Sequence, residues 1–289
     1  MRVAITGATG QLGSDIVEVF KASDRLEAVG LTHDDIEVCD VESVRTALTK
    51  HRPEAVINSA AFHQVDACEE QPEQAFRVNA VGAWNVARVC AEINALCVYI
   101  STDYVFDGGK GAPYTEEDTP APLNVYGVSK LAGEHLTRIA CPQCLIARVA
   151  SVIGKSGARG KGGNFIEAIL KKAKSGDTLK VVNDTRMTPT YTMDAARALV
   201  EIIEKRVVGL VHLTNQGPCS WHDFANKAVE LCGLATEVAP VGSDAYPSKV
   251  QRPVDSSLRS LRLGNILGSP MRPWEEALKD YLLEKGHIG

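Results

Sequence analysis

The sequence lacks the features that mark membrane, secreted and repeat proteins. It contains no run of eighteen apolar residues, and residues 1–7 enter a strand-like run without a basic region, a long apolar core or a cleavage site. This pattern argues against a membrane span and against a signal peptide. Internal repeats and low-complexity tracts are also missing. We therefore expect a cytoplasmic protein with no membrane partner.

Regular cysteine spacing is absent as well. The eight cysteines are scattered through apolar stretches, unlike those of a secreted disulfide scaffold, and most are expected to be small buried hydrophobes. Cys141-Pro-Gln-Cys144 has the spacing of a redox pair or of half a zinc site. No second pair follows it, and the seven histidines form no His-Glu-x-x-His motif. We expect no metal site and interpret Cys141 and Cys144 as thiols in a loop, with a functional pair as the alternative.

A strong charge of either sign is likewise missing. The 289 residues include 36 acidic and 31 basic side chains, and the net charge of −5 is spread along the chain. This mild acidity argues against nucleic acid as a partner. A chain of this length buries roughly three quarters of its unfolded surface. Its core therefore needs no disulfide or structural metal.

Short apolar runs alternate with longer segments of helical periodicity in the first half. The unbroken runs that predict buried strands cover residues 3–6, 27–32, 55–58, 96–101 and 145–149. The predicted helices between them cover residues 12–21, 41–50, 72–93 and 125–139. This alternation predicts an α/β fold with a doubly wound parallel (Rossmann) sheet, covered by helices on both faces. Ligands are expected at the edge where the strands end.

The second half mixes its patterns. It predicts helices over residues 164–174, 192–204, 220–231 and 273–283, and strands over 179–182 and 209–214. The glycine-rich segment 154–163 predicts a mobile loop. We predict a dinucleotide-binding domain of residues 1–150 plus about 189–216. A smaller, interleaved C-terminal α/β domain for the substrate would then comprise about 151–188 plus 217–289.

The first chemical motif is Thr6-Gly-Ala-Thr-Gly-Gln-Leu-Gly13, between a predicted strand and a predicted helix. Gly7, Gly10 and Gly13 allow a tight turn, close approach of a pyrophosphate and packing of the helix on the sheet. The helix N-terminus offers free N–H groups to the phosphates. Glycine spacing alone is weak evidence, but its place between a predicted strand and a predicted helix favours a dinucleotide site over a plain turn.

The residues after the second predicted strand bear on the choice of cofactor. An acidic residue there binds a ribose 2′-hydroxyl and repels a 2′-phosphate. The strand ends in Thr32-His33-Asp34-Asp35, in which Thr32 and His33 carry no obligate negative charge. Asp34 and Asp35 either reach the ribose or form a solvated turn. The pattern favours NADP(H) and leaves NAD(H) open.

The second motif is Tyr126-Gly-Val-Ser-Lys130, inside a predicted helix. Residues four apart share a helix face, so we expect the Lys130 ammonium to lower the pKa of Tyr126 from its ordinary value near 10. The block Ser101-Thr-Asp-Tyr-Val-Phe-Asp-Gly108 ends the preceding strand, and Ser101 or Thr102 is placed to hold a substrate carbonyl beside the tyrosine. The structural alternative is a capping hydroxyl, a half-buried aromatic ring and a solvated lysine.

Together with Asn58-Ser-Ala-Ala61, these motifs resemble the extended short-chain dehydrogenase/reductase superfamily, and within it the dTDP-4-dehydrorhamnose reductase family. The similarity covers nearly the whole chain and includes the blocks 183–190, 209–215, 220–225 and 252–258. It implies an NAD(P)-dependent oxidoreductase that reduces a nucleotide-linked 4-keto-6-deoxy sugar, first of all dTDP-4-dehydro-L-rhamnose to dTDP-L-rhamnose.

The resemblance also implies roles for single residues. Thr102, Tyr126 and Lys130 would be catalytic: Thr102 binds the carbonyl oxygen, Tyr126 protonates the alkoxide, and Lys130 keeps the tyrosine pKa near the working range. Implied cofactor-binding residues are Gly7, Gly10, Gln11, Leu12, Gly13, Asp40, Val41, Ala60, Ala61, Tyr126 and Lys130. Implied substrate-binding residues are His63, Val65, Thr102, Asp103 and Arg252. His63 is alternatively a satisfied surface histidine.

The chain departs from the family at one position. The family has a tryptophan that packs on the sugar, where this chain has Ser151 in Arg148-Val-Ala-Ser-Val-Ile153; a serine supplies no stacking surface. A reductase of another nucleotide 4-keto sugar is therefore one alternative, and a non-catalytic, cofactor-binding regulatory subunit is another. Asp103-Tyr104 replaces the Asp-Glu pair of the related dehydratases, which argues against dehydration. A homodimer stays open.

A nucleotide-sugar substrate brings a diphosphate, which a protein of net charge −5 must neutralise locally. The candidate cations are Lys155, Arg159, Lys161, Arg186 and Arg252. Arg252 is favoured because it belongs to the Arg-Pro block that the family shares.

Overall fold

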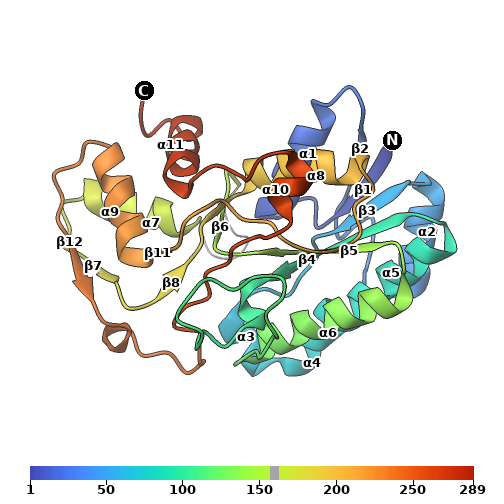
Figure 1. Cartoon of the computed structure of the whole chain (residues 1–289), viewed down its shortest axis with the longest axis horizontal. Helices are drawn as coiled ribbons and strands as arrows, with labels where there is room; N and C mark the ends of the chain where they lie inside the picture. Colours follow the sequence, from blue (N-terminus) through green and yellow to red (C-terminus); the bar gives the residue numbers. More distant parts are fainter. Residues whose placement is uncertain (157–162) are drawn as a thin grey trace.

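The structure is a computed structural model that describes residues 1–156 and 163–289. A six-stranded parallel sheet forms its centre (Figure 1). The strands are β1 (Arg2–Thr6), β2 (Glu27–Leu31), β3 (Ala55–Asn58), β4 (Leu96–Thr102), β5 (Cys144–Val149) and β10 (Gly209–His212), in the order β10-β5-β4-β3-β1-β2. The predicted doubly wound parallel sheet is therefore confirmed. Because the strand order reverses between β1 and β3, ligands are expected above the carboxyl ends of these two strands.

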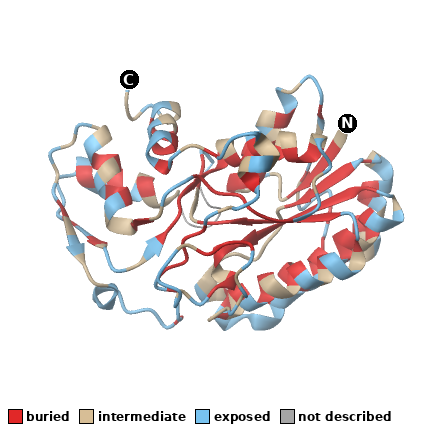
Figure 2. Ribbon diagram, viewed as in Figure 1, coloured by how far each residue is buried: buried red, intermediate tan, exposed pale blue. Residues whose placement is uncertain are grey.

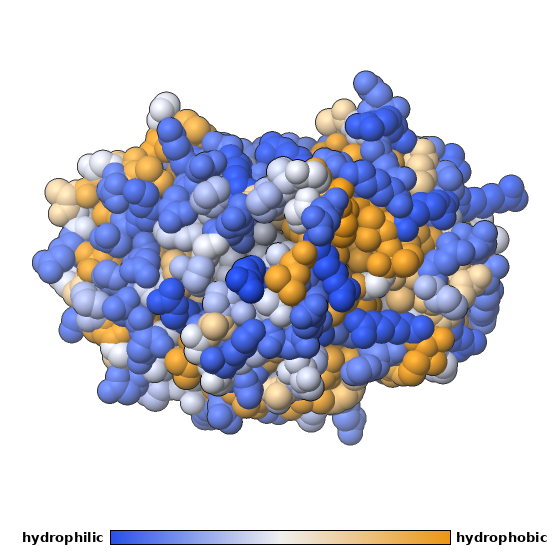
Figure 3. Space-filling view, viewed as in Figure 1, coloured by the Kyte–Doolittle hydropathy of each residue, from blue (hydrophilic) through white to orange (hydrophobic). Residues whose placement is uncertain are grey.

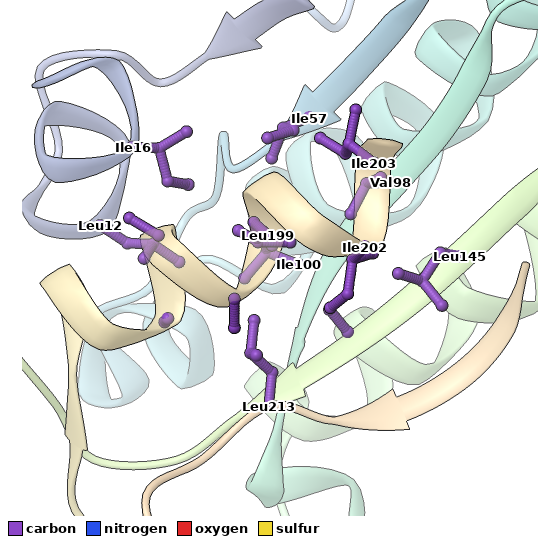
Figure 4. Close-up of a cluster of buried hydrophobic side chains, with 14 of the residues drawn as sticks. Leu12, Ile16, Ile57, Val98, Ile100, Leu145, Leu199, Ile202, Ile203 and Leu213 are labelled. Carbon is purple, nitrogen blue, oxygen red and sulfur yellow. The ribbon is translucent and has the colours of Figure 1, made fainter. Parts of the chain in front are cut away.

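Helices cover both faces of the sheet, as the alternation predicts (Figure 1). The helices α1 (Gln11–Lys21) and α8 (Thr192–Glu204) lie side by side on one face, and α2 (Val41–His51), α5 (Ala83–Glu92) and α6 (Val125–Ala140) lie on the other. Val98 and Ile100 of β4 belong to the α1–α8 core (Figure 4), whereas Cys97 packs in the core beneath α2 and α5. Both faces of the sheet are thus buried (Figure 2).

The helix predicted over residues 72–93 is not regular along its length. It consists of α4 (Pro72–Phe76), the π-helical segment η1 (Arg77–Gly82) and α5. A short helix, α3 (Val65–Glu70), precedes it and was not predicted. π-Helical turns often occur at functional sites, because they displace side chains from the regular helix face. The π-helical segment contains the buried Asn79, whose contacts are described below.

A smaller C-terminal layer contains α7 (Phe165–Lys174), α9 (Trp221–Leu231) and α11 (Trp274–Glu284), close to the predicted bounds. Three two-stranded pieces accompany them: β7 (Leu179–Val182) with β12 (Val238–Val241), β8 (Arg186–Met187) with β11 (Cys219–Ser220), and β6 (Val152–Ile153) with β9 (Thr190–Tyr191). The remaining short helices are η2 (Asp103–Val105), η3 (Ser243–Ala245) and α10 (Leu263–Leu267). The last predicted strand ends at His212, two residues early.

The division into two domains stays a prediction, with two observations in its favour. β10 extends the central sheet by pairing with β5, and α8 packs against α1, although both elements come from the second half of the chain. Most of the predicted loop at 154–163 lies outside the described residues. Arg159 and Lys161 lie outside them as well.

In the described part of the chain, no helix combines the length and the apolar composition that a membrane span requires. Hydrophilic side chains cover most of the face drawn in Figure 3, and apolar side chains gather on its right half.

Candidate active site at the carboxyl edge of the sheet

The turn after β1 is closely packed at its glycines. Gly7 has a φ of +65°, and a Cβ atom on it would lie 3.0 Å from the Ser59 hydroxyl. A Cβ atom on Gly13 would lie 2.2 Å from the carbonyl oxygen of Gly7. Side chains are therefore excluded from both positions, because backbone atoms occupy the space. The motif has the close helix–strand packing expected of a dinucleotide-binding turn.

The ends of β1 and β3 are held together beside this turn. The Thr6 hydroxyl donates to Asn58 Oδ1 at 2.8 Å, and the Ser59 hydroxyl donates to the carbonyl oxygen of Thr6 at 2.5 Å. The Ala60 N–H also reaches the Thr6 hydroxyl, at 3.4 Å. Ala60 and the neighbouring Ala61 thus border the glycine turn at the point where the strand order reverses.

The N-terminus of α1 suits an anionic group. Gly10 is its N-cap and provides no side-chain cap, and the first turn holds no acidic residue. Gln11 donates from Nε2 to the carbonyl oxygen of Val152 at 2.7 Å, while its buried Oε1 has no hydrogen-bond partner among the described residues. Free N–H groups, an unpaired amide oxygen and a cradle that only glycines allow all fit a dinucleotide. Leu12, in contrast, is part of the apolar core.

The residues at the predicted adenine end have structural tasks of their own. Asp40 is the N-cap of α2 and accepts a 3.0 Å hydrogen bond from the Glu42 N–H, and Val41 is the first residue of that helix. Asp35 accepts hydrogen bonds from both the N–H and the hydroxyl of Thr32, which hold the pKa of its carboxyl below the ordinary value. Asp35 therefore stabilises the turn after β2, which was one of the two predicted alternatives.

Thr102 and Tyr126 meet above the end of β4. Thr102 is the last residue of β4; its hydroxyl caps η2 by accepting from the Tyr104 N–H at 3.2 Å, and it also hydrogen-bonds Tyr126. Asn124 begins α6 by accepting from the Gly127 N–H at 2.9 Å, which directs Tyr126 toward the strand end. The Tyr126 ring packs edge-to-face on Tyr104, with ring centroids 5.9 Å apart.

The expected lowering of the Tyr126 pKa by Lys130 is wrong for the protein without ligands. Burial raises the pKa of Tyr126 above its ordinary value, and the hydrogen bond with Thr102 opposes this rise. The phenol is thus fully protonated at neutral pH. Tyr126 therefore holds its proton in the absence of ligands.

Lys130 is almost fully buried, at 2% exposure, where the sequence left open a solvated lysine. Its ammonium donates to the carbonyl oxygen of Ile100 at 2.7 Å and lies 4.1 Å from the centroid of the Tyr99 ring. Burial lowers the pKa of Lys130 to about 7, while the Glu134 carboxylate acts in the opposite direction. The main chain of β4 thus holds the ammonium in place. The buried environment disfavours the charged form of the lysine.

Asp103 adds a second buried ionisable group to the site. Its Oδ1 accepts from the Thr102 hydroxyl at 3.1 Å, and it also contacts the Ser256 hydroxyl. Burial raises the pKa of Asp103 to about 6. Hydroxyl, phenol, ammonium and carboxyl groups therefore share one region beside a dinucleotide turn, as the carbonyl-reducing site of an oxidoreductase requires.

Comparison with known proteins agrees with this arrangement. A family model described as "RmlD substrate binding domain" matches residues 1–286. The chain is 38% identical to the spore coat polysaccharide biosynthesis protein SpsK of Bacillus subtilis (strain 168), with 98% of each chain covered. It is 37% identical to the dTDP-4-dehydrorhamnose reductase of Mycolicibacterium smegmatis, with 96% of this chain and 84% of that protein covered. The solved dTDP-4-dehydrorhamnose reductase of Bacillus anthracis str. Ames in complex with NADP is 32% identical, with a TM-score of 0.91 over 98% of this chain and 99% of that chain.

The chain belongs to the RmlD substrate binding domain family. The resemblance to dTDP-4-dehydrorhamnose reductases is thereby confirmed along almost the full length of the chain.

The RmlD resemblance also implied His63 and Val65 as substrate neighbours. His63 lies in the loop that leaves β3, and Val65 follows this loop as the first residue of α3. Asn79 of the π-helical segment holds this loop: its side chain accepts from the Phe62 N–H and donates to the Phe62 carbonyl oxygen, each at 2.9 Å. It also donates to the Ser129 hydroxyl at 3.0 Å, next to Lys130. Sequence reasoning missed Asn79, because nothing in its sequence neighbourhood signals a π-turn.

The RmlD-family arginine, Arg252, has a protein partner in this structure. Its guanidinium pairs with the Asp66 carboxylate of α3 at 2.9 Å and also hydrogen-bonds Tyr104. Lys155 lies 3.8 Å from Glu284, and Arg186 is exposed on β8. Among the described diphosphate candidates that the sequence singled out, Arg252 contacts η2, through Tyr104.

Ser151 occupies the place of the RmlD-family tryptophan in a left-handed conformation, with a φ of +40°. Its carbonyl oxygen accepts from the Thr190 N–H at 3.3 Å.

Cys141 follows α6 and Cys144 begins β5, so both lie at the amino end of the strands, away from the edge that holds the candidate site. They are buried with raised thiol pKa values. Such thiols are inert, because the thiolate is the reactive form. The described residues hold no group of three potential metal ligands.

Proposed function

We propose that this chain reduces the 4-keto group of dTDP-4-dehydro-L-rhamnose to give dTDP-L-rhamnose, with NADP(H) as its cofactor. The observation that carries the proposal is that Thr102 and Tyr126 meet above the end of β4, with Lys130 one turn along α6 and the glycine turn at the same edge of the sheet, in a chain whose full-length relatives include dTDP-4-dehydrorhamnose reductases. When bound, the reduced nicotinamide supplies the hydride that becomes the new C–H bond.

The chain's own residues bind the ketone and supply the proton. The Thr102 hydroxyl hydrogen-bonds the carbonyl oxygen and orients it toward the phenol. Tyr126 then gives its proton to this oxygen as negative charge develops there, so the ketone becomes a secondary alcohol and the phenolate regains a proton from solvent. The Lys130 ammonium stabilises the transient phenolate by its charge. Tyr126 acts as a neutral phenol, the form that its buried site favours. Lys130 acts as the ammonium, which burial disfavours and the Glu134 carboxylate supports.

NADP(H) is the proposed cofactor on two grounds. The Bacillus anthracis relative was solved in complex with NADP. In this chain the Asp35 carboxylate is turned back on Thr32, so it does not extend toward a 2′-phosphate. Asp34 lies in the same turn and is exposed. Dissociation constants for NADPH and NADH, measured by nicotinamide fluorescence, test the preference; tighter NADH binding would contradict it.

Ser151 supports a second substrate of the same class. A serine leaves the sugar without the aromatic surface that the family tryptophan gives, so a different 4-keto-6-deoxy nucleotide sugar is the alternative. The Arg252 guanidinium, half exposed beside Tyr104, is proposed to bind the diphosphate of either substrate.

The deciding experiment incubates the purified protein with NADPH or NADH and a panel of 4-keto-6-deoxy nucleotide sugars, and follows the loss of reduced-nicotinamide absorbance. Turnover is expected with dTDP-4-dehydro-L-rhamnose. Tight cofactor binding without turnover of any sugar would reject the reductase and favour a cofactor-binding regulatory subunit.

A further inference from the structure

We propose that Glu134 and Arg148 are positioning residues that act through Lys130: their buried ion pair fixes the place of the Lys130 ammonium and supports its charge. The proposal rests on the reductase function above for its kinetic consequences only. Its structural content concerns the charge of one lysine and can be measured without turnover.

The ion pair itself is well formed and almost inaccessible. Arg148 donates from Nε to Glu134 Oε1 at 2.8 Å and from Nη2 to Oε2 at 2.7 Å. The Glu134 side chain is 1% exposed and the Arg148 side chain 3%. Burying two charges costs free energy that apolar side chains of similar size would not cost. Stability alone therefore does not explain why a buried ion pair occurs at this position.

Three elements meet at Glu134, and two of them, α6 and β4, carry residues of the candidate site. It lies on α6, one helical turn after Lys130 and two turns after Tyr126. Arg148 comes from β5, and the Ser101 hydroxyl of β4 donates to Glu134 Oε1 at 2.6 Å. Ser101 directly precedes Thr102. The carboxylate thus fixes the helix that bears the phenol and ammonium against the strand end that bears the hydroxyl.

The charge of Glu134 acts on Lys130 directly. At four residues' separation the two groups share the buried face of α6, and the carboxylate favours the charged form of the lysine against the effect of burial. Ionisable groups face this region from every element packed there, namely Tyr126 and Glu134 on α6, Tyr99 on β4, Asp103 on η2, Cys68 on α3 and Arg148 on β5. Of these groups, the Glu134 carboxylate supports the lysine's charge.

Arg148 makes this support stable. Without it the carboxylate would be a buried charge held by the Ser101 hydroxyl alone among its described partners, and a buried charge without a counter-charge is costly. The guanidinium also packs on the Phe106 ring, with Cζ 5.1 Å from the ring centroid. Arg148 is therefore the residue that holds the Glu134 carboxylate in place.

The test measures the titration of Lys130 by NMR of protein labelled with ¹³C at the lysine Cε, with the signal assigned from its loss in Lys130→Arg. In Glu134→Gln the lysine is expected to titrate about one pH unit lower or more, because the supporting charge is lost while Arg148 remains. The alkaline limb of the kcat/KM profile should move in the same direction. Arg148→Lys keeps the cation and should leave both titrations in place.

Two further variants keep the test decisive. Glu134→Leu combined with Arg148→Met removes both charges and replaces them with apolar side chains, which generally preserves folding; here a downward shift smaller than that of Glu134→Gln is expected. Asp194→Asn breaks another ion pair, with Arg272, whose atoms approach to 2.8 Å, and should leave Lys130 unchanged.

An unchanged Lys130 titration in both the Glu134→Gln protein and the folded double variant would overturn the proposal, since a purely structural ion pair predicts that result. A shifted lysine in a protein that turns over no sugar would support the electrostatic role and reject only the reductase function.

Discussion

The ammonium of Lys130 donates a 2.7 Å hydrogen bond to the carbonyl oxygen of Ile100, two residues before Thr102. The bond joins α6, which carries Tyr126, to the strand end that carries the hydroxyl. Lys130 therefore has a geometric task in addition to its charge, and the two tasks are separable by experiment.

Replacing Lys130 by Met should change how stability depends on pH. The lysine binds a proton up to about pH 7 in the folded protein but up to about 10.5 when unfolded, so between these values the unfolded state binds more protons. The wild-type free energy of unfolding should gain up to ~1.4 kcal/mol per pH unit from this group across that window. Urea unfolding at several pH values should show that Lys130→Met lacks this gain. Parallel curves for the two proteins would contradict the lowered lysine pKa.

Replacing Tyr126 by Phe removes the proposed proton donor while keeping the ring on Tyr104. Turnover of the 4-keto sugar should fall by roughly 10²- to 10⁴-fold, the usual worth of a general acid, with NADPH affinity little changed. Tyr246→Phe is the matched control, because Tyr246 is exposed and its hydroxyl bonds only the Lys180 carbonyl oxygen among the contacts described for it. A fully active Tyr126→Phe protein would show that another group supplies the proton.

Replacing Asp103 by Asn should stabilise the protein at neutral pH. Burial raises the folded pKa of Asp103 to about 6 from 3.8, so this group's contribution is fully present below about pH 4 and is lost as the pH rises through 6. Asp103→Asn should therefore exceed the wild type by up to roughly 3 kcal/mol above pH 6 and by much less near pH 4. Thermal or urea unfolding at pH 4.5 and pH 7.5 checks the sign of the difference.

Replacing Gly13 by Ala should damage the dinucleotide turn. The new Cβ atom would meet the Gly7 carbonyl oxygen at 2.2 Å, and neither backbone segment can move without shifting α1. We expect a loss of about 1–3 kcal/mol of stability and weaker NADPH binding, measured by unfolding and by fluorescence titration. Gly264→Ala, where the nearest atom lies 3.5 Å away, is the control.

Replacing Arg252 by Gln should raise the KM for the nucleotide sugar about tenfold, as expected for the loss of one charge-assisted hydrogen bond to a phosphate. NADPH affinity should not change. Asp66→Asn, which removes the arginine's partner at 2.9 Å, should leave the KM equal or lower. A raised KM in both variants would instead assign the ion pair to the stability of the loop.

Local patterns predicted the sheet well because its strands are buried on both faces, so each appears as an unbroken apolar run. They could not predict the π-turn at Asn79, since the π-helical segment spans only six residues, too few to show a period of its own. The two-residue strands β6, β8, β9 and β11 are too short to show any period.

The same limit applies to the site. The spacing of Tyr126 and Lys130 predicted that they share a helix face, but not that both would be buried. Burial raises the tyrosine pKa instead of lowering it, and the ammonium bonds the Ile100 carbonyl oxygen. The pairing of Arg252 with Asp66 joins residues 186 positions apart and has no local signal.

The placement of α8 on the sheet also has a consequence for the order of folding during synthesis. The first 150 residues leave the ribosome before α8 and β10 exist, so the sheet face that Val3, Ile5 and Val98 line has only α1 to cover it. A nascent chain of that length therefore exposes an apolar surface, the kind of surface that chaperones bind and that aggregates. The central sheet acquires its last strand only when translation is nearly three quarters complete.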